Sequence, residues 1–210
     1  MTEAPASRAE QKERTRRAIL DAALGLCDDA PLAALSLRQV AKQVGIVPTA
    51  FYRHFASIED LGLALVQESL VSLRAVLRDV RQGGAPEYRT IIDRSVAVLV
   101  EHVRAQRAHF AFIARERMAG PAGVRQAIAD GIVLFEAELA ADLARLPGTS
   151  AWSSADLRIV SNLIVSAMVT TAEELVAIEP GSSEEERVAH YARTQLRMLL
   201  VGATHWRSRP

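Results

Sequence analysis

Apolar residues recur at helical spacing along almost the whole of this 210-residue chain. In the first such segment, over about residues 8–29, the spacing i, i+3, i+4, i+7 that marks an amphipathic helix is made by Ile19, Ala22, Ala23, Leu26, Cys27 and Ala30. No stretch shows the strict alternation of a half-buried strand. The pattern predicts an all-α fold of about nine helices, with Cys27 as a buried core thiol.

Two short helices are predicted next, between residues 36 and 54. Ser36 and Gln39 have the spacing of a capping box, which opens a helix over residues 37–44 that Gly45 ends. Pro48 suits the first turn of a helix and opens another that continues to about His54. The pair has the spacing of a helix-turn-helix. An ordinary helical hairpin has the same spacing, so spacing alone leaves both interpretations open.

Charge separates these two interpretations. The chain holds 25 basic and 25 acidic residues, a net charge of zero. No acidic residue occurs between Asp29 and Glu59, however, and Arg38, Lys42 and Arg53 lie in that window. Since cation–phosphate contacts supply most of the affinity of a protein for DNA, the acid-free window favours the helix-turn-helix.

The same residues resemble a known family. Residues 36–41, 44–46 and 49–55 resemble the N-terminal module of the TetR family of transcriptional regulators, although Ile58 stands where many members have a phosphate-binding lysine. Residues 8–11, 114–116, 124–129 and 196–206 extend the resemblance, most closely to the fatty-acid regulators FabR and DesT. It implies a three-helix DNA-binding domain over residues 1–56 and an effector-binding and dimerisation domain over residues 57–210.

The resemblance also implies how DNA is bound. A homodimer would place one recognition helix from each subunit on a palindromic double-stranded operator. Tyr52 and His54 would hold phosphates, Thr49, Ala50 and Arg53 would face bases or nearby phosphates, and Arg17 and Arg38 would anchor the flanking backbone. The full set of expected DNA-contacting residues is Arg17, Ser36, Arg38, Pro48, Thr49, Ala50, Tyr52, Arg53 and His54. Phe51 and Phe55 are expected in the core.

For the effector, the resemblance favours a long-chain fatty acyl-CoA and a repressor of fatty-acid or lipid-metabolism genes. Such a ligand needs apolar walls and cations for its phosphates. The candidates are Arg74, Arg78, Phe110, Phe112, Ile113, Phe135 and Met168. Plain core residues and a solvated helix face have the same pattern. A regulator of efflux or of another pathway with a different hydrophobic effector, and a helical ligand carrier that never binds DNA, remain alternatives.

Residues 154–178 are apolar on every face, which favours either a central core helix or a subunit interface. The resemblance implies that the last two helices form a four-helix dimer interface. Its expected residues are Ile159, Leu163, Val169, Leu196, Leu199 and Leu200.

Several classes of protein are not expected. The chain has no Gly-rich phosphate loop, CxxC, HExxH or G-x-S-x-G motif, so neither an enzyme nor a cofactor is predicted. Its five histidines show no i, i+4 pair, which argues against a metal site. The longest uncharged stretch, residues 159–172, has 14 residues, short of the roughly 18 to 20 that a membrane span needs. With one cysteine and no secretion signal, a cytoplasmic protein is expected.

Overall fold

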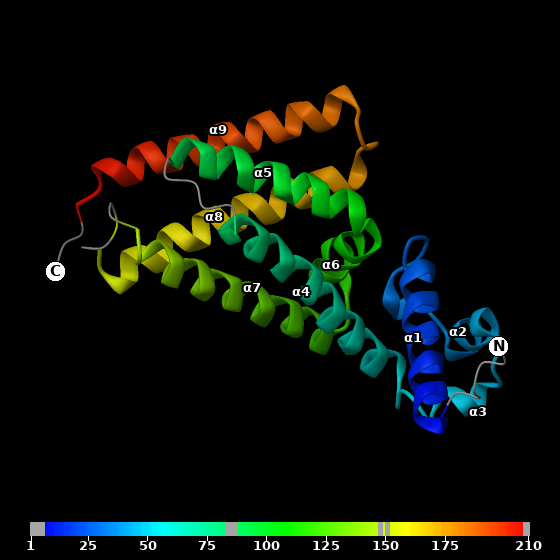
Figure 1. The fold of residues 1–210 in the computed structure, drawn as a ribbon. Helices are drawn as coiled ribbons and strands as arrows, with labels where there is room; N and C mark the ends of the chain where they lie inside the picture. The colour runs from blue at the N-terminus through cyan, green and yellow to red at the C-terminus, as the bar shows by residue number, and fades with distance from the viewer. Residues whose placement is uncertain (1–6, 83–87, 147–148, 150–151, 208–210) are drawn as a thin grey trace, which may run out of the picture. The chain divides into compact units, whose positions relative to one another are not determined.

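The computed structural model describes residues 7–82, 88–146, 149 and 152–207, and these residues form nine α-helices and one short 3-10 helix with no strand (Figure 1). The all-α prediction is confirmed. In chain order the elements are α1 (Arg8–Leu26), η1 (Leu32–Ala34), α2 (Leu37–Val44), α3 (Pro48–Phe51), α4 (Ile58–Gln82), α5 (Tyr88–Ala105), α6 (Arg107–Ala119), α7 (Ala122–Leu143), α8 (Ser154–Ala177) and α9 (Ser183–His205).

Side-chain caps open the N-terminal helices. The Ser36 hydroxyl accepts from the Gln39 amide at 3.2 Å, and the Gln39 side chain accepts from the Ser36 amide at 2.8 Å. This reciprocal pair satisfies two backbone donors that the helix leaves free and confirms the predicted start of α2. Before α4, the Ser57 hydroxyl accepts from the Asp60 amide at 3.0 Å, while the Asp60 carboxylate accepts from Ala56 instead of Ser57.

The turn between α2 and α3 depends on a glycine. Gly45 has φ 75°, a left-handed conformation that costs glycine least, and it ends α2 where predicted. Helix α3 is shorter than predicted, since it ends at Phe51 and not at about His54. From there the amide of His54 bonds the carbonyl of Phe51 at 2.8 Å, which is the tighter 3-10 pattern common at helix ends. The sequence also predicts a break between helices at Gly83 to Pro86, and these residues lie outside those that the structure describes.

The chain divides into two compact units. Unit 1 comprises Met1–Ser69 and Ala111–Ile128, and unit 2 comprises Leu70–Phe110 and Ala129–Pro210. Helices α4, α6 and α7 therefore each supply residues to both units. These units divide the chain at other residues than the predicted domains 1–56 and 57–210, which stay a prediction.

Aromatic rings form part of the core of unit 1. Phe51 is fully buried and Phe55 is 2% exposed, and their ring centroids lie 5.8 Å apart. Cys27 is buried as well, and burial raises the pKa of its thiol to about 12. These findings confirm that both phenylalanines and the cysteine serve the core.

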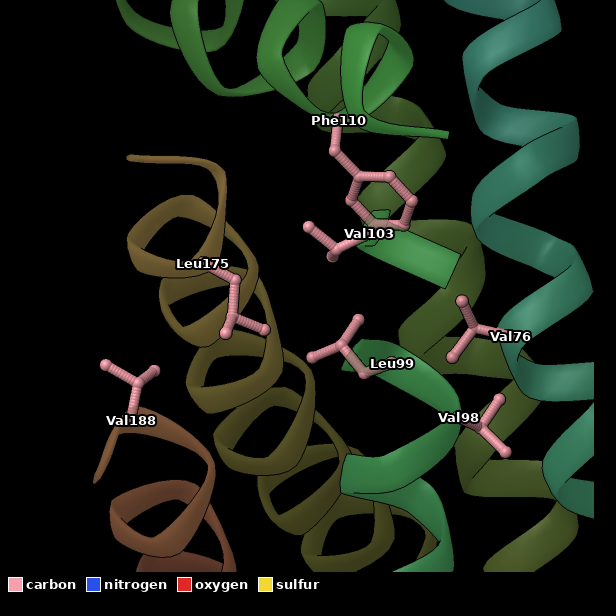
Figure 2. Close-up of a cluster of buried hydrophobic side chains, with 7 residues drawn as sticks. All are labelled: Val76, Val98, Leu99, Val103, Phe110, Leu175 and Val188. Carbon is pink, nitrogen blue, oxygen red and sulfur yellow. The ribbon is translucent and has the colours of Figure 1, made fainter. Parts of the chain in front are cut away.

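Unit 2 is built around α5, which packs against both α8 and α9. Figure 2 shows Leu99, Val103 and Phe110 directed into one interior, with Val76 on one side and Leu175 on the other. A second cluster joins Ile92 and Val96 of α5 to α9 through Ala189, Ala192 and Leu196.

Candidate functional site

The helix-turn-helix, residues 36–54, presents most of its predicted contact residues to solvent. The exposed ones are Ser36, Arg38, Pro48, Thr49, Tyr52 and Arg53, while Ala50 and His54 are half-buried. Tyr52 is 61% exposed although its neighbour Phe51 is fully buried. The alternation arises because Phe51 anchors α3 in the core and the residues around it face outward.

The helix-turn-helix carries three exposed cations, Arg38, Lys42 and Arg53. Within the part of the chain that the structure describes, no ion pair involves Arg38, Lys42 or Arg53. The cations of the acid-free window therefore keep no carboxylate partner among the residues that the structure describes. An unpaired guanidinium or ammonium can bind a phosphate without first releasing a carboxylate.

His54 is a neutral member of this surface. Burial lowers the pKa of its imidazole below the ordinary 6.5, and the nearby cations Lys12, Arg16 and Arg53 lower it further, against a smaller opposing effect of Glu13. Its Nδ1 is buried and has no hydrogen-bond partner among the described residues. A proton on Nδ1 would be unsatisfied, so we assign the neutral tautomer that carries its proton on Nε2.

Arg17 is exposed but already engaged. Its guanidinium lies 3.2 Å from the Asp21 carboxylate and 3.1 Å from that of Glu68. A phosphate would have to compete with both carboxylates. The predicted role of Arg17 as a backbone anchor stays a prediction.

The predicted effector residues are divided between the two units. Phe112 and Ile113 are buried in unit 1. In unit 2, Phe110 belongs to the core cluster of Figure 2 and Met168 packs against it. The Arg74 guanidinium lies 5.8 Å from the centre of the Phe135 ring and 3.5 Å from the Glu138 carboxylate. Arg78 lies 3.6 Å from the carboxylate of Asp79.

A groove of about 470 Å³ lies along α8 and α9 of unit 2. It is lined by Glu174, Arg187, Val188, His190, Tyr191 and Thr194. None of the predicted effector residues lines this groove. Their assignment to an effector site stays a prediction, and in the present conformation the four aromatic and aliphatic candidates Phe110, Phe112, Ile113 and Phe135 are core residues.

Helices α8 and α9 leave apolar side chains exposed. Ile159 and Leu163 of α8 are 59% and 46% exposed, and Met198 of α9 is 71% exposed. Val169, Leu199 and Leu200 are half-buried. Leu196 differs from the other predicted interface residues because it is 6% exposed and belongs to the core of its own unit. It therefore has little surface left for a partner.

By length and composition alone, α8 is apolar enough to cross a membrane, with a mean hydropathy of 1.4 over its most apolar 18 residues. This 18-residue window extends beyond the uncharged stretch at residues 159–172 on which the prediction of no membrane span rests. Core helices of soluble proteins meet the same criterion, but only 22% of the window is buried within the chain. The exposed apolar surface of α8 therefore needs another cover.

Two family models match the chain in succession. The model of the bacterial regulatory proteins of the tetR family matches residues 19–65, and the model of the tetracyclin repressor-like C-terminal domain matches residues 88–202. The second match alone spans more than half of the chain. The chain belongs to the TetR family of transcriptional regulators.

Solved structures share the TetR fold over nearly their full length. FadR of Bacillus halodurans, a fatty acid degradation regulator, has 14% identity and a TM-score of 0.69, with both chains fully covered. FadR of Bacillus subtilis, solved in complex with stearoyl-CoA, has 16% identity and a TM-score of 0.69 over 89% of this chain and 98% of its own. A TetR-like regulator of Rhodococcus sp. RHA1 has 19% identity and a TM-score of 0.66 over 95% and 100%.

Family membership decides between the function classes. TetR proteins are transcription regulators and not enzymes, so the prediction of no catalytic activity is confirmed. TetR regulators bind DNA operators and small-molecule effectors and form dimers. A helical carrier that never binds DNA is therefore excluded, and the resemblance to FabR and DesT stays a prediction.

Two adjacent charged residues of α6 lie in the segment 114–116 that carries part of the resemblance, but no contact was predicted for either of them. Arg115 donates to the backbone carbonyls of Cys27, Asp28 and Ala30 beyond the end of α1. The fully buried Glu116 accepts from the Leu32 amide at 2.9 Å. All these partners lie more than 80 residues away in the sequence, and no local pattern signals them.

Gly120 is the one local sign of this arrangement. A Cβ at Gly120 would lie 2.6 Å from the Glu116 carbonyl oxygen and 2.8 Å from its carboxylate. The absence of a side chain at this position makes room for the buried carboxylate. A glycine four residues after a glutamate is too common a pattern to have identified Glu116 from the sequence.

Proposed function

We propose that this TetR regulator binds a palindromic operator as a homodimer, with α3 of each subunit in the major groove of one half-site. The observation that carries the proposal is the set of solvent-exposed cations Arg38, Lys42 and Arg53, none of which pairs with a carboxylate among the described residues. Arg38 and Arg53 supply unpaired cations for phosphates, and Thr49 and Ala50 at the start of α3 are small enough to approach base edges. Tyr52 and His54 supply neutral donors.

The homodimer gives the apolar surface of α8 and α9 its cover. Ile159 and Leu163 are exposed on α8, and Tyr191, Met198 and Val201 are 61–71% exposed on α9. Burial of such side chains against a second copy removes them from water. A dimeric helix-turn-helix protein contacts half-sites about one DNA turn apart, so a shared α8–α9 interface would bring two helix-turn-helix segments together in one assembly.

Selection from a random duplex library tests this function. We expect a palindrome whose half-sites lie about one turn, roughly 10 base pairs, apart. Sedimentation should give a dimer for the wild type and a monomer for Leu163→Asp, which places a charge in the interface. The monomer should lose the palindromic site. A selected site without two-fold symmetry, or a variant that stays dimeric, would contradict the proposed assembly.

For the effector we propose a long-chain fatty acyl-CoA, and for the regulated genes those of fatty-acid or lipid metabolism, repressed by a cytoplasmic protein. The support is the FadR structure of Bacillus subtilis with stearoyl-CoA, together with the apolar side chains Phe110, Phe135 and Met168 in unit 2. Arg74 and Arg78 are the cations that would meet the phosphates. The second candidate is another hydrophobic effector, which the same apolar side chains would suit.

Stearoyl-CoA, free stearate and coenzyme A alone distinguish the two candidates. If the acyl-CoA proposal holds, saturating stearoyl-CoA changes operator affinity by roughly 5- to 150-fold, the usual range of allosteric coupling, and neither fragment does so. A response to stearate alone would favour a simpler hydrophobic effector. If none of the three compounds changes operator affinity, the acyl-CoA proposal is overturned, while the proposed DNA-binding function is unaffected.

A further inference from the structure

Arg16 connects α1 to the C-terminal end of the recognition helix. One guanidinium nitrogen of Arg16 donates to the carbonyl of His54 at 3.0 Å. The guanidinium carbon lies 4.3 Å from the centre of the Phe55 ring. The carbonyl of His54 follows α3, where the backbone acceptors of a helix end lack partners in the helix itself. The contact spans 38 residues of sequence.

The neighbouring arginines of α1 have different partners. Arg14 binds Gln11 on its own helix at 2.7 Å, and Arg17 binds the carboxylates of Asp21 and Glu68. Both are exposed, whereas Arg16 is half-buried. The three arginines look equivalent in the sequence, but only the guanidinium of Arg16, among these three, is held against the segment that carries Tyr52, Arg53 and His54.

We propose that Arg16 is a positioning residue that fixes the segment 52–54 relative to α1 and does not itself contact phosphate. Phe55 is 2% exposed, so the ring is a fixed surface on which the planar guanidinium stacks while it donates to the carbonyl. The donors of Tyr52, Arg53 and His54 are thereby held in one arrangement before DNA arrives. Less conformational freedom is then lost on binding. The inference rests on the proposed DNA-binding function of this segment.

Lysine cannot replace arginine in this role. Its ammonium is a compact, strongly hydrated charge without the planar fork that can stack on a ring and donate in the plane at once. Arg16→Lys therefore keeps the charge and removes the geometry. Arg16→Gln removes the charge and keeps an amide that can still donate. The two variants separate a positioning role from a phosphate contact.

The first measurement is the affinity of Arg16→Lys for the selected operator, at a temperature where circular dichroism shows it folded. We expect a loss of about tenfold or more, the usual effect of losing a charge-assisted hydrogen bond. Arg14→Lys, a change of the same kind two residues away, should bind as the wild type does. A merely structural role would lower the melting temperature of Arg16→Lys and leave the affinity of the folded protein unchanged.

The second measurement is the salt dependence of binding to random duplex DNA. Each lost phosphate contact makes the negative slope of log K against log salt shallower by about 0.9. A dimer that carries the substitution twice should therefore have a slope that is shallower by about 1.8. Arg53→Gln should show this loss. Arg16→Gln should change the slope by less than half as much.

The positioning role is overturned if Arg16→Lys binds the operator as tightly as the wild type, or if Arg16→Gln loses as much slope as Arg53→Gln. The latter result would make Arg16 a phosphate ligand. Failure of the wild type to bind DNA in a salt-dependent manner would instead refute the proposed function, and random duplex DNA detects that failure without any knowledge of the operator.

Discussion

Arginines meet different surroundings in the two units of the chain. On the helix-turn-helix surface of unit 1, Arg38 and Arg53 have no carboxylate partner among the described residues. In unit 2, Arg104 binds Glu185, Arg197 lies 2.5 Å from Asp93 and Arg193 lies 2.8 Å from Glu186. Unpaired cations are available to a polyanion, whereas paired ones hold their own helices together.

This difference explains how a chain with no net charge can belong to a family of DNA-binding proteins. Carboxylates of unit 2 neutralise many of its own arginines, and the surplus of positive charge remains where the acid-free window of the sequence lies. Net charge reports the sum over both kinds of arginine. Whether an arginine pairs with a carboxylate indicates whether its charge is available to bind DNA.

Reversing one unpaired charge should have the largest effect. In Arg53→Glu the dimer loses two phosphate contacts and gains two repulsive charges, so affinity for random duplex DNA at about 0.1 M salt should fall by more than about 50-fold. The salt slope should fall by at least about 1.8. Fluorescence anisotropy over a salt series measures both quantities.

Arg145→Glu is the matched control for this charge reversal. Arg145 is 77% exposed and lies 3.3 Å from Asp142 at the end of α7 in unit 2. The substitution changes the net charge of the chain by the same amount but away from the helix-turn-helix. If both variants lost the same affinity, total charge would govern DNA binding and the contrast between the two units would have no functional meaning.

Removing a paired arginine should lower stability instead of DNA affinity. Glu185 is 6% exposed and accepts from Arg104 Nε at 3.0 Å and from the Gly181 amide at 2.7 Å. Arg104→Met leaves this carboxylate with fewer partners, so the free energy of unfolding should fall by more than it does when an exposed pair is broken. Urea denaturation measures it, and the folded variant should bind DNA as the wild type does.

The pH dependence of Arg104→Met identifies the ion pair as the cause. The hydrogen bond with Arg104 holds the pKa of Glu185 below its ordinary 4.5. The stabilisation is therefore complete above that value and is lost as pH falls through the folded pKa. The difference between wild type and variant should shrink in acid. Arg145→Met, which breaks an exposed pair, should cost less than about 0.5 kcal/mol, and an equal cost would contradict the distinction between buried and exposed partners.

The helices of both units were predictable from the sequence because their signals are local. The capping box of Ser36 and Gln39, the turn at Gly45 and the apolar stripe through Ile19 act over three to eleven residues. The end of α3 was placed three residues too late because its periodicity continues to Phe55, while the backbone tightens after Phe51. Periodicity specifies which side chains are buried and does not distinguish an α-helical turn from a 3-10 turn.

Contacts between distant residues could not be predicted in the same way. Arg16 and Arg17 are adjacent, yet one binds a carbonyl 38 residues away and the other a carboxylate 51 residues away. Arg115 and Glu116 bind residues of the α1–η1 connection more than 80 residues earlier. These partners depend on how helices pack, and composition cannot select among 25 cations and 25 anions.

The smallest expected effect concerns His54, the histidine of the helix-turn-helix surface. Because the pKa of His54 is lower in the folded chain than its ordinary 6.5, the unfolded chain binds more protons as pH falls below that value. The contribution of His54 to the free energy of unfolding should therefore be constant above about pH 7 and should decline as pH falls from 6.5 toward the pKa of His54 in the folded chain. His54→Gln removes this titration, so its free energy of unfolding should vary less over the same window.

The same variant tests whether a neutral donor differs from a cation on one DNA-binding surface. Gln offers an uncharged N–H group, as neutral His54 does. The slope of log K against log salt for His54→Gln on random duplex DNA should therefore differ from the wild-type slope by less than about half of 0.9 per subunit, the change expected for one lost phosphate contact. Arg53→Gln should lose the full amount. If His54→Gln lost as much slope as Arg53→Gln, His54 would bind DNA as a cation, and the approach of phosphates would have to raise the pKa of its imidazole enough to offset both its burial and the surrounding cations.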